Sequence, residues 1–265
     1  MISKLADIHP DAIIGKNVFI DSFAVVQKGA NIGDNSHIMS HAIVMQSSAI
    51  GKNCTVFPGA VIGAIPQDLK FDGEETYVSI GDNTTIRECV TVNRGTKDKW
   101  KTVIGNNCLL MAYTHVAHDC IVGNNVILAN SVQLAGHVEV GDYAILGGLA
   151  AAIQFAKIGQ HTYIAGHTEI RKDVPPYVKA ARDPLSYVGI NSVGLQRRGF
   201  STEKINNILD IYRHLYNKGM NISQALEFIE NALPSSTEKT EILSFAKESK
   251  KGVIKLYSKG ISDED

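Results

Sequence analysis

Every sixth residue of this 265-residue chain is aliphatic over most of the stretch from Ile2 to Ile170. Of the 29 positions in this ladder, 25 are Ile, Leu or Val, so the pattern is not a product of composition; the exceptions are Asp68, Glu74, Asp98 and Ala152. A period of six fits neither the helix period of 3.6 nor, by itself, the strand period of two. It fits a short strand and a tight turn, repeated in units that bury their faces only by stacking.

A second ladder lies two residues before the first and carries mostly small side chains. Ala24, Ala42, Cys54 and Thr114 are examples, and Gly often follows the aliphatic residue, as in Ile32-Gly33. Each unit therefore offers one large inward side chain and a smaller one near the bend, where glycine supplies backbone freedom.

These hexads, of the form aliphatic-Gly-x-x-small-x, resemble those of the hexapeptide-repeat acyltransferases. The resemblance implies a left-handed parallel β-helix, although crossover connections in general are right-handed. It also implies that three hexads make one triangular coil, so that residues eighteen apart stack at the strand spacing of about 4.8 Å. We therefore predict a mainly β protein, a left-handed parallel β-helix followed by a small α-helical domain.

The period divides the chain into three parts. Residues 1–176 are predicted as the β-helix, ending at Pro175-Pro176, with external loops at 65–77 and 94–101 where Pro66 and charged residues interrupt the ladder. Residues 177–200 are predicted as a connector. Residues 201–265 are predicted as an α-helical domain, with an N-cap at Ser201 and helices over about 202–218, 223–233 and 237–250.

Composition limits the possible partners and the location. The chain has 26 basic and 27 acidic residues, which argues against a nucleic-acid partner. No apolar run approaches the roughly 18 to 20 residues of a membrane span, and the first ten residues lack the apolar core of a signal peptide. Three cysteines occupy the small-residue ladder, which favours structural thiols over disulfides or a metal site. We expect a cytoplasmic protein without a membrane span or bound metal.

Four residues with acid–base chemistry fall on neither ladder and are predicted to lie outside the coil: His115, His118, Asp119 and His137. The eighteen-residue spacing aligns His118 with Gly136 and Gln154 on successive coils, and places His137 above Asp119. One strip of the surface thus gathers a base, a carboxylate and a backbone without a side chain. The expected ordinary solvated histidines are His9, His37, His41 and His214.

Loop and connector motifs narrow the resemblance. T-H-V-A-H-D-C, Q-D-L-K, N-R-G-T, L-A-G-H, D-V-P-P-Y-V and G-L-Q-R-R-G-F together resemble the UDP-N-acetylglucosamine O-acyltransferases over essentially the whole chain. The resemblance implies transfer of an acyl chain, usually 3-hydroxylated, from acyl carrier protein to the 3-position of the sugar nucleotide, the first step of lipid A synthesis. It implies no cofactor, because the acyl group arrives on the 4'-phosphopantetheine of the carrier protein.

The resemblance also implies catalytic roles. His118 would be the general base, which suits a side chain that titrates near working pH. Asp119 would orient the imidazole, and the Gly136 amide would stabilise the oxyanion. No Ser or Cys lies beside a base in this strip, so we expect direct transfer without an acyl-enzyme.

Further roles come from the same resemblance. The amino sugar would be bound by Gln67, Asp68, Lys70 and His115. His137 would meet the acyl hydroxyl region, Gln154 would line the nucleotide pocket, and Gly166 would set acyl length. The uridine diphosphate would be held by Asn191, Arg197 and Arg198, since a guanidinium donates two parallel hydrogen bonds to phosphate. Members of the family are homotrimers with active sites between subunits. Candidate contacts to the acidic carrier protein are Arg171, Lys172, Lys179 and Arg182.

Three departures from the common family pattern leave the acyl chain and the acceptor open. Ile153 stands where many members have the His of V-H-Q-F, Val193 replaces a Glu, and Arg182-Asp183-Pro184 replaces a Gly-Asn-His run. Acyl length, and a 3-hydroxyl against a 3-amino acceptor, are therefore not predicted.

Several alternatives remain at this stage. The lipid A N-acyltransferases and the coenzyme A-dependent acetyltransferases share the hexads, although the former carry an additional domain before the helix. A zinc-dependent carbonic anhydrase on the same scaffold would use His115, His118 and His137 as ligands. A non-enzymatic β-helix would need neither the H-V-A-H-D-C motif nor the two loops.

Overall fold

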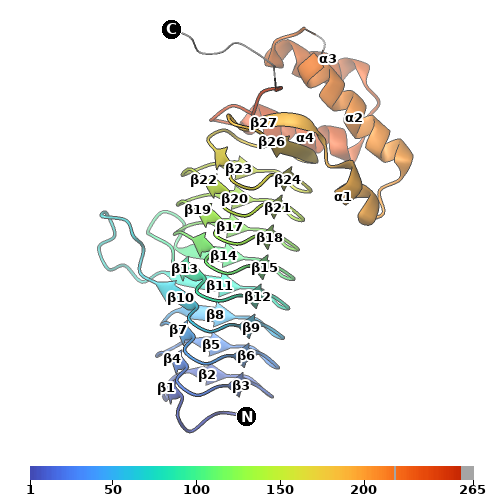
Figure 1. Ribbon diagram of the computed structural model, residues 1–265. Helices are drawn as coiled ribbons and strands as arrows, with labels where there is room; N and C mark the ends of the chain where they lie inside the picture. Colours follow the sequence, from blue (N-terminus) through green and yellow to red (C-terminus); the bar gives the residue numbers. More distant parts are fainter. Residues whose placement is uncertain (218, 258–265) are drawn as a thin grey trace.

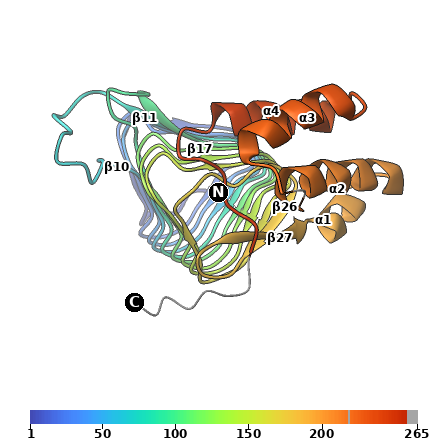
Figure 2. The same cartoon turned by 90° about the horizontal axis from the view of Figure 1, so that it is seen from above.

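The computed structural model describes residues 1–217 and 219–257, and it consists of a column of stacked triangular coils with helices at one end (Figure 1). Seen from above, the coils superpose as a triangle (Figure 2). Three parallel sheets form the faces of the column. Strand numbers increase by three along the first two sheets and along most of the third, because the chain visits each face once per coil; the last two strands of the third sheet depart from this step.

The first face contains nine strands: β1 (Asp7–Ile8), β4 (Val25–Val26), β7 (Ile43–Val44), β10 (Val61–Ala64), β13 (Thr91–Asn93), β16 (His115–Val116), β19 (Gln133–Leu134), β22 (Ala151–Ala152) and β25 (Glu169–Ile170). The second face contains eight: β2 (Ile13–Ile14), β5 (Asn31–Ile32), β8 (Ser48–Ile50), β11 (Tyr77–Ile80), β14 (Lys101–Ile104), β17 (Ile121–Val122), β20 (Glu139–Val140) and β23 (Lys157–Ile158).

The third face contains ten strands: β3 (Phe19–Ile20), β6 (His37–Ile38), β9 (Thr55–Val56), β12 (Thr85–Ile86), β15 (Leu109–Leu110), β18 (Ile127–Leu128), β21 (Ile145–Leu146), β24 (Tyr163–Ile164), β26 (Val178–Ala181) and β27 (Ser186–Ile190). We call the bend from the first to the second face the first corner, the next bend the second corner, and the bend back to the first face the third corner.

The aliphatic ladder forms the core, as its period predicts. Outside the two loops, each of its residues from Ile20 to Ile170 is at most 4% exposed, including Ala152. The pairing register stacks them: Leu128 lies between Leu110 and Leu146. Burial of this continuous apolar column, at roughly 25 cal/mol per Å², is the main stabilising contribution of the β-helix.

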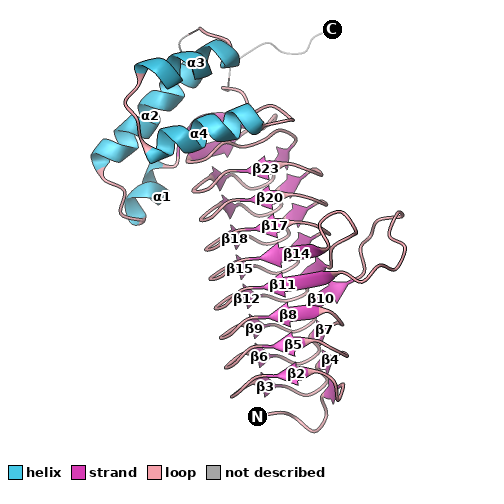
Figure 3. Ribbon diagram, turned by 180° about the vertical axis from the view of Figure 1, so that it is seen from behind, coloured by secondary structure: helices cyan, strands magenta, loops and turns pink. Residues whose placement is uncertain are grey.

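The two external loops leave the column without disturbing its core. Both emerge from the first corner, after β10 and after β13 (Figure 3). Ile50 pairs with Ile80 and Val92 pairs with Val116, so the ladder stays in register across each loop. The strands place the loops at residues 65–76 and 94–100, one residue shorter at the end than the predicted 65–77 and 94–101.

The segment predicted only as a connector, residues 177–200, contains regular structure. β26 continues the third face by pairing in parallel with β24, so the coil extends beyond the predicted end at Pro176. β27 then pairs antiparallel with β26, and α1 (Ser192–Arg197) follows. The prolines end the ladder because proline cannot donate a hydrogen bond to a sheet, but the chain resumes pairing directly after them.

Three longer helices cover the end of the column (Figure 1). They are α2 (Thr202–Asn217), α3 (Ile222–Ala232) and α4 (Thr237–Glu248). The Ser201 hydroxyl accepts from Lys204 N at 3.2 Å, the N-cap that the sequence predicts. After α4 the chain forms single bridges to the column through Val253 and Leu256 rather than a further helical turn. Residues 258–265 of the predicted helical part lie outside the described residues. Within residues 1–217 and 219–257, every helix is too short or too polar to cross a membrane.

Candidate active site

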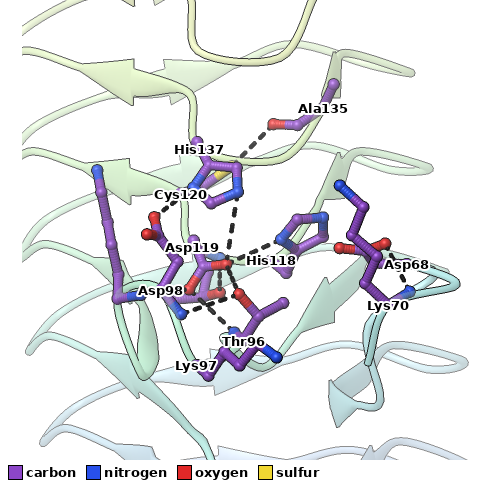
Figure 4. Close-up of polar contacts among 12 residues, drawn as sticks. Asp68, Lys70, Thr96, Lys97, Asp98, His118, Asp119, Cys120, Ala135 and His137 are labelled. Carbon is purple, nitrogen blue, oxygen red and sulfur yellow. Dashed lines mark hydrogen bonds and ion pairs between the residues drawn. The ribbon is translucent and has the colours of Figure 1, made fainter. Parts of the chain in front are cut away.

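His118 and Asp119 form a hydrogen-bonded pair at the first corner, between β16 and β17 (Figure 4). His118 Nδ1 lies 2.9 Å from Asp119 Oδ2. The Asp119 backbone has a φ of +60°, the left-handed conformation that the sharp bend requires. This contact leaves His118 Nε2 as the nitrogen available to a substrate, and it fixes the tautomer with the proton on Nδ1.

The prediction that these side chains lie on an outer surface is correct for their direction and wrong for their exposure. Both point away from the core, yet His118 is 5% exposed and Asp119 is fully buried. The reason is the 94–100 loop, which folds over the carboxylate. Thr96 donates to it twice, from its amide N to Oδ1 at 2.9 Å and from its hydroxyl to Oδ2 at 2.6 Å.

These contacts determine the charge of Asp119. Burial raises the pKa of this carboxyl, but the hydrogen bonds from Thr96 and His118 and the nearby His137 outweigh burial and hold the pKa below its usual value. The carboxylate is therefore ionised at neutral pH. An ionised partner favours the imidazolium that forms when His118 takes a proton.

His137 lies one coil above Asp119, where the eighteen-residue spacing puts it. Its Nε2 is 3.8 Å from Asp119 Oδ2 and its Nδ1 is 3.2 Å from Asp98 Oδ2. Its ring stacks on Phe155, with centroids 4.4 Å apart. Burial lowers the pKa of His137 in spite of the two carboxylates. The side chain thus lies behind the pair, and it is not one of the residues that line the groove described next.

A groove of about 760 Å³ runs up the first face from His118. Five predicted site residues line it: Gln67, His115, His118, Gly136 and Gln154. Its wall above the pair includes the apolar residues Ala135, Ala151 and Ile153, and Arg171 lies among its lining residues. The groove therefore has a polar end at the histidines and an apolar length, a shape suited to a ligand with a polar head and an acyl chain.

Gly136 presents a bare backbone to His118. A Cβ atom built at this position would lie 2.5 Å from His118 Cε1 and 2.6 Å from Nε2, so a side chain cannot fit beside the imidazole. Among the residues that the structure describes, the Gly136 amide has no hydrogen-bond acceptor, while the flanking amides of Ala135 and His137 donate to Ala152 and His118. A free N–H beside the imidazole is the kind of donor that an oxyanion requires.

The other predicted sugar-binding residues surround the same end of the groove. His115 Nδ1 is 2.7 Å from the Thr91 hydroxyl, and burial together with His118 lowers the pKa of His115. Asp68 and Lys70 lie on the 65–76 loop, where the Lys70 amide donates to Asp68 Oδ1 at 3.0 Å. Figure 4 shows both on the side of His118 away from Asp98. The exposed Lys70 is not among the groove's lining residues.

The predicted nucleotide-binding residues lie at a different corner. Asn191 caps α1 and donates to His161 O at 2.9 Å, while Arg198 Nη2 donates to Tyr143 O at 3.0 Å. Arg197 is in the last turn of α1. Tyr143 and His161 belong to the second corner, whereas His118 belongs to the first. Gly166 is at the third corner, where a Cβ would approach Gly148 O to 2.8 Å. One chain alone does not bring these residues to His118.

Sequence reasoning missed an aromatic stack beside Arg198. His161 lies between Tyr143 and Tyr177, with ring centroids 4.8 and 5.6 Å away. Burial and the nearby Arg198 lower the pKa of His161 to about 4, so the ring is neutral at physiological pH. The signal was available for Tyr143 and His161, which lie eighteen residues apart, whereas Tyr177 follows His161 after only sixteen residues and breaks the period.

Thr96 was missed as well. The N-R-G-T motif is part of the family resemblance, which gives its last residue no role. The signal that could have identified Thr96 is its position in a loop that interrupts the ladder, one coil below the H-V-A-H-D-C motif.

A metal centre is poorly supported by the donor set. His118, Asp119 and His137 bring ligand atoms within 4.8 Å of one another. Both Asp119 oxygens, however, accept hydrogen bonds from Thr96, and His118 turns Nδ1 toward the carboxylate rather than toward an open position. These contacts leave His118 Nδ1 and both Asp119 oxygens engaged with protein groups rather than free for a metal ion.

Comparisons with known proteins show which family the chain belongs to. A family model described as Udp N-acetylglucosamine O-acyltransferase, Domain 2, matches residues 173–254, and one described as Bacterial transferase hexapeptide (six repeats) matches 11–44 and 101–136. The chain is 49% identical over 271 residues to an acyl-[acyl-carrier-protein]–UDP-N-acetylglucosamine O-acyltransferase of Sulfurihydrogenibium sp. (strain YO3AOP1), covering 98% of this chain and 100% of the relative. The corresponding protein of Thermodesulfovibrio yellowstonii is 42% identical over 256 residues, with 96% and 99% covered.

Solved structures extend the likeness to the fold. The structure described as a UDP-N-acetylglucosamine acyltransferase from Bacteroides fragilis 9343 superposes with a TM-score of 0.95 at 49% identity, covering 96% of this chain and 100% of the other. This match and the hexapeptide model confirm the predicted left-handed parallel β-helix with a C-terminal helical part. With relatives of this identity matched over their whole length, the chain is an acyltransferase that belongs to the acyl-[acyl-carrier-protein]–UDP-N-acetylglucosamine O-acyltransferase family.

Proposed function

We propose that this enzyme transfers a 3-hydroxyacyl chain from acyl carrier protein to the 3-hydroxyl of UDP-N-acetylglucosamine, the first step of lipid A synthesis, in the cytoplasm. The observation that carries the mechanism is the His118–Asp119 pair facing the bare Gly136 backbone in a groove with an apolar wall. Family membership supplies the substrate class, and this geometry supplies the catalytic groups.

The proposed reaction is direct attack. His118 Nε2 removes the proton of the sugar hydroxyl as its oxygen bonds to the thioester carbon, and the Gly136 amide donates to the oxyanion that develops. The tetrahedral intermediate then collapses by breaking the carbon–sulfur bond, and the imidazolium returns the proton to the phosphopantetheine thiolate. A positioned base contributes about 10² to 10⁴ in rate. One oxyanion donor contributes about 3 to 4 kcal/mol.

An acyl-enzyme is not part of this proposal. The nearest thiol is Cys120, whose Sγ donates to Ala135 O at 3.1 Å. Burial raises the pKa of Cys120 to about 12, so it is protonated and lies on the core side of the bend. The Thr96 hydroxyl is engaged with Asp119. Neither group is a nucleophile facing the groove, and the acyl group needs no bound cofactor other than the carrier's own phosphopantetheine.

Mass spectrometry of the products tests the function. The protein is incubated with UDP-N-acetylglucosamine and a panel of acyl carrier protein thioesters of different length, with and without the 3-hydroxyl. We expect one acyl group esterified to the 3-position, and no product with acetyl-coenzyme A. Acetyl transfer, or acylation only of an acceptor with a 3-amine in place of the hydroxyl, would assign a different reaction. Ile153, which is 41% exposed and lines the groove, makes acyl length the property to measure.

The separation of the predicted residues supports a shared active site. His118 lies at the first corner and Arg198 at the second corner of the same chain. In a cyclic homotrimer the first corner of one subunit can face the second corner of its neighbour, which would join the base to the nucleotide-binding arginines. We propose this assembly, with acyl carrier protein docking near Arg171 and Lys172 at the end of the groove.

Mixing two inactive variants tests the shared site. His118→Ala and Arg198→Ala should each lose activity, whereas co-refolded mixtures should recover about one quarter of wild-type activity, because random assembly of a closed ring pairs intact halves at that frequency. Homotrimers of each variant, refolded alone, are the control. Mixed trimers without recovered activity would place both residues in the same subunit's site.

A further inference from the structure

We propose that Thr96 is a positioning residue, which fixes the Asp119 carboxylate and, through it, the imidazole of His118. The proposal rests on the proposed function, because it assigns His118 as the base. It adds a group that touches neither substrate nor reacting atoms. Thr96 is 7% exposed and lies on the loop that follows β13, one coil below the pair (Figure 4).

Hydrogen bonds from Thr96 fix the plane of the Asp119 carboxylate. The torsion of an aspartate carboxylate about its last bond is broad, so a single hydrogen bond from His118 does not fix its plane. Thr96 adds a second and a third contact from one residue, its amide to Oδ1 at 2.9 Å and its hydroxyl to Oδ2 at 2.6 Å. Oδ2 is the oxygen that holds His118 Nδ1. Two donors on opposite oxygens lock the plane that the imidazole must match.

The hydroxyl proton of Thr96 points toward the Asp119 carboxylate. A threonine hydroxyl has one proton and can also accept. The Asp98 amide donates to Thr96 Oγ1 at 3.3 Å, so the hydroxyl accepts from the backbone and gives its single proton to the carboxylate. Serine can reproduce this arrangement, whereas valine, which has the same shape, cannot.

The 94–100 loop is anchored by hydrogen bonds on both sides of Thr96. Trp100 N donates to Thr96 O at 2.7 Å and Gly95 N donates to Tyr77 O at 3.2 Å. The next residue, Lys97, donates its amide to Glu74 Oε1 at 3.0 Å, which ties this loop to the one that carries Asp68 and Lys70. The backbone of Thr96 is therefore held on both sides, so its amide and hydroxyl donors stay in a fixed position relative to the Asp119 carboxylate.

The charged groups around Asp119 determine how the pKa of its carboxyl responds when the Thr96 hydroxyl is removed. His118 and His137 face it from the two coils, and Lys99 and Asp98 approach from the loop, where Lys99 Nζ is engaged with Glu139 at 2.9 Å. The Lys99 amide also donates to Asp119 Oδ1 at 3.3 Å, but among the described residues the Thr96 hydroxyl is the hydrogen-bond donor that Oδ2 receives besides His118. Removing the hydroxyl takes away a donor that favours the carboxylate, so the pKa of Asp119 rises.

The experiment compares Thr96→Val with Thr96→Ser, and uses Thr76→Val as a matched control. Thr76 is fully buried near the same loops, and its hydroxyl has no hydrogen-bond partner among the described residues. Because a hydrogen bond to a charged group is among the stronger ones, we expect Thr96→Val to lower kcat about 10- to 100-fold with KM changed less than about threefold. Thr96→Ser should stay within about threefold of wild type and Thr76→Val within about twofold.

The pH profile separates positioning from stability. In Thr96→Val the acid limb of kcat/KM should move to higher pH, because a carboxylate that has lost the Thr96 donor attracts the Nδ1 proton of His118 more strongly and so favours the protonated imidazole, which cannot act as a base. A purely structural role would lower the melting temperature and leave the limb in place. Equal losses in Thr96→Val and Thr96→Ser, or an unchanged kcat and acid limb in Thr96→Val, would overturn the proposal.

A measurement that does not depend on catalysis tests the role of Thr96 separately from the proposed function. Proton NMR should show a hydrogen-bonded His118 Nδ1–H signal in wild type and Thr96→Ser, assigned by its loss in His118→Ala. It should broaden or shift upfield in Thr96→Val. If wild type gave no acylated sugar but the signal followed these variants, the proposed reaction would fail while Thr96 kept its role. An unchanged signal in Thr96→Val would overturn the role of Thr96.

Discussion

His118→Ala is expected to lower kcat by about 10² to 10⁴, the usual contribution of a positioned general base. Among the described residues, His118 is the groove-lining histidine that is paired with a buried aspartate, and the substitution removes its imidazole. KM for the sugar nucleotide should change little, because the proposed binding groups stay in place. Asp119 keeps both hydrogen bonds from Thr96, so the fold should persist with a melting temperature close to wild type.

A matched control is His41→Ala. His41 is also an outward-facing residue of a bend, but it is exposed at the third corner and stacks on Phe23 with centroids 5.3 Å apart. Its loss should leave kcat within about twofold, as for most surface substitutions. Product formation by mass spectrometry and a thermal melt are measured for both. A folded His118→Ala enzyme that kept more than a tenth of wild-type kcat would show that another group takes the proton.

Gly136→Ala should be nearly as damaging, although it adds a single methyl group. The new Cβ would lie 2.5 Å from His118 Cε1, well inside the roughly 3.5 to 4.0 Å at which carbon atoms normally meet. The imidazole must swing away, and this breaks its alignment with Asp119. We expect a loss of about 10² to 10³ in kcat, comparable to that from a displaced base or a lost oxyanion donor.

Two further variants test whether the loss in Gly136→Ala comes from the contact between the new methyl group and His118. Gly148→Ala changes the same hexad position at the third corner, where the nearest atom to the new Cβ is Asn130 O at 3.3 Å, and it should lose little activity. In the double variant His118→Ala/Gly136→Ala the methyl group finds space, so activity should match that of His118→Ala alone. Full additivity of the two losses in this cycle would mean that Gly136 acts independently of the base.

The periodic part of the structure could be predicted from the sequence because the six-residue period determines both which side chains face the core and which residues pair on neighbouring coils. The same six-residue step that turns Leu128 inward also stacks it between Leu110 and Leu146. It predicted the vertical neighbours of the site as well, since the His137 amide donates to His118 O at 3.0 Å. The helices followed from ordinary capping signals, as at Ser201.

What could not be predicted depends on contacts outside the period. The path of the 94–100 loop is set by its own hydrogen bonds to Tyr77 and Asp119, and it turned an expected exposed strip into a buried pair. The pairing of β26 with β24 after Pro176 depends on a bend that the ladder does not encode. The position of Arg198 at another corner is a property of the assembled coils, whereas a motif gives only residue identities.

The two loops at the first corner have a consequence for how such a protein can change. Each leaves the column and rejoins it without altering which ladder residues meet, as Ile50 with Ile80 and Val92 with Val116 show. The length and composition of most of the 65–76 loop are therefore free of the demands of pairing within the column, whereas the 94–100 loop must keep Thr96 against Asp119. Evolution or an engineer can exchange the first of these segments and thereby change recognition, while the column beneath remains the same.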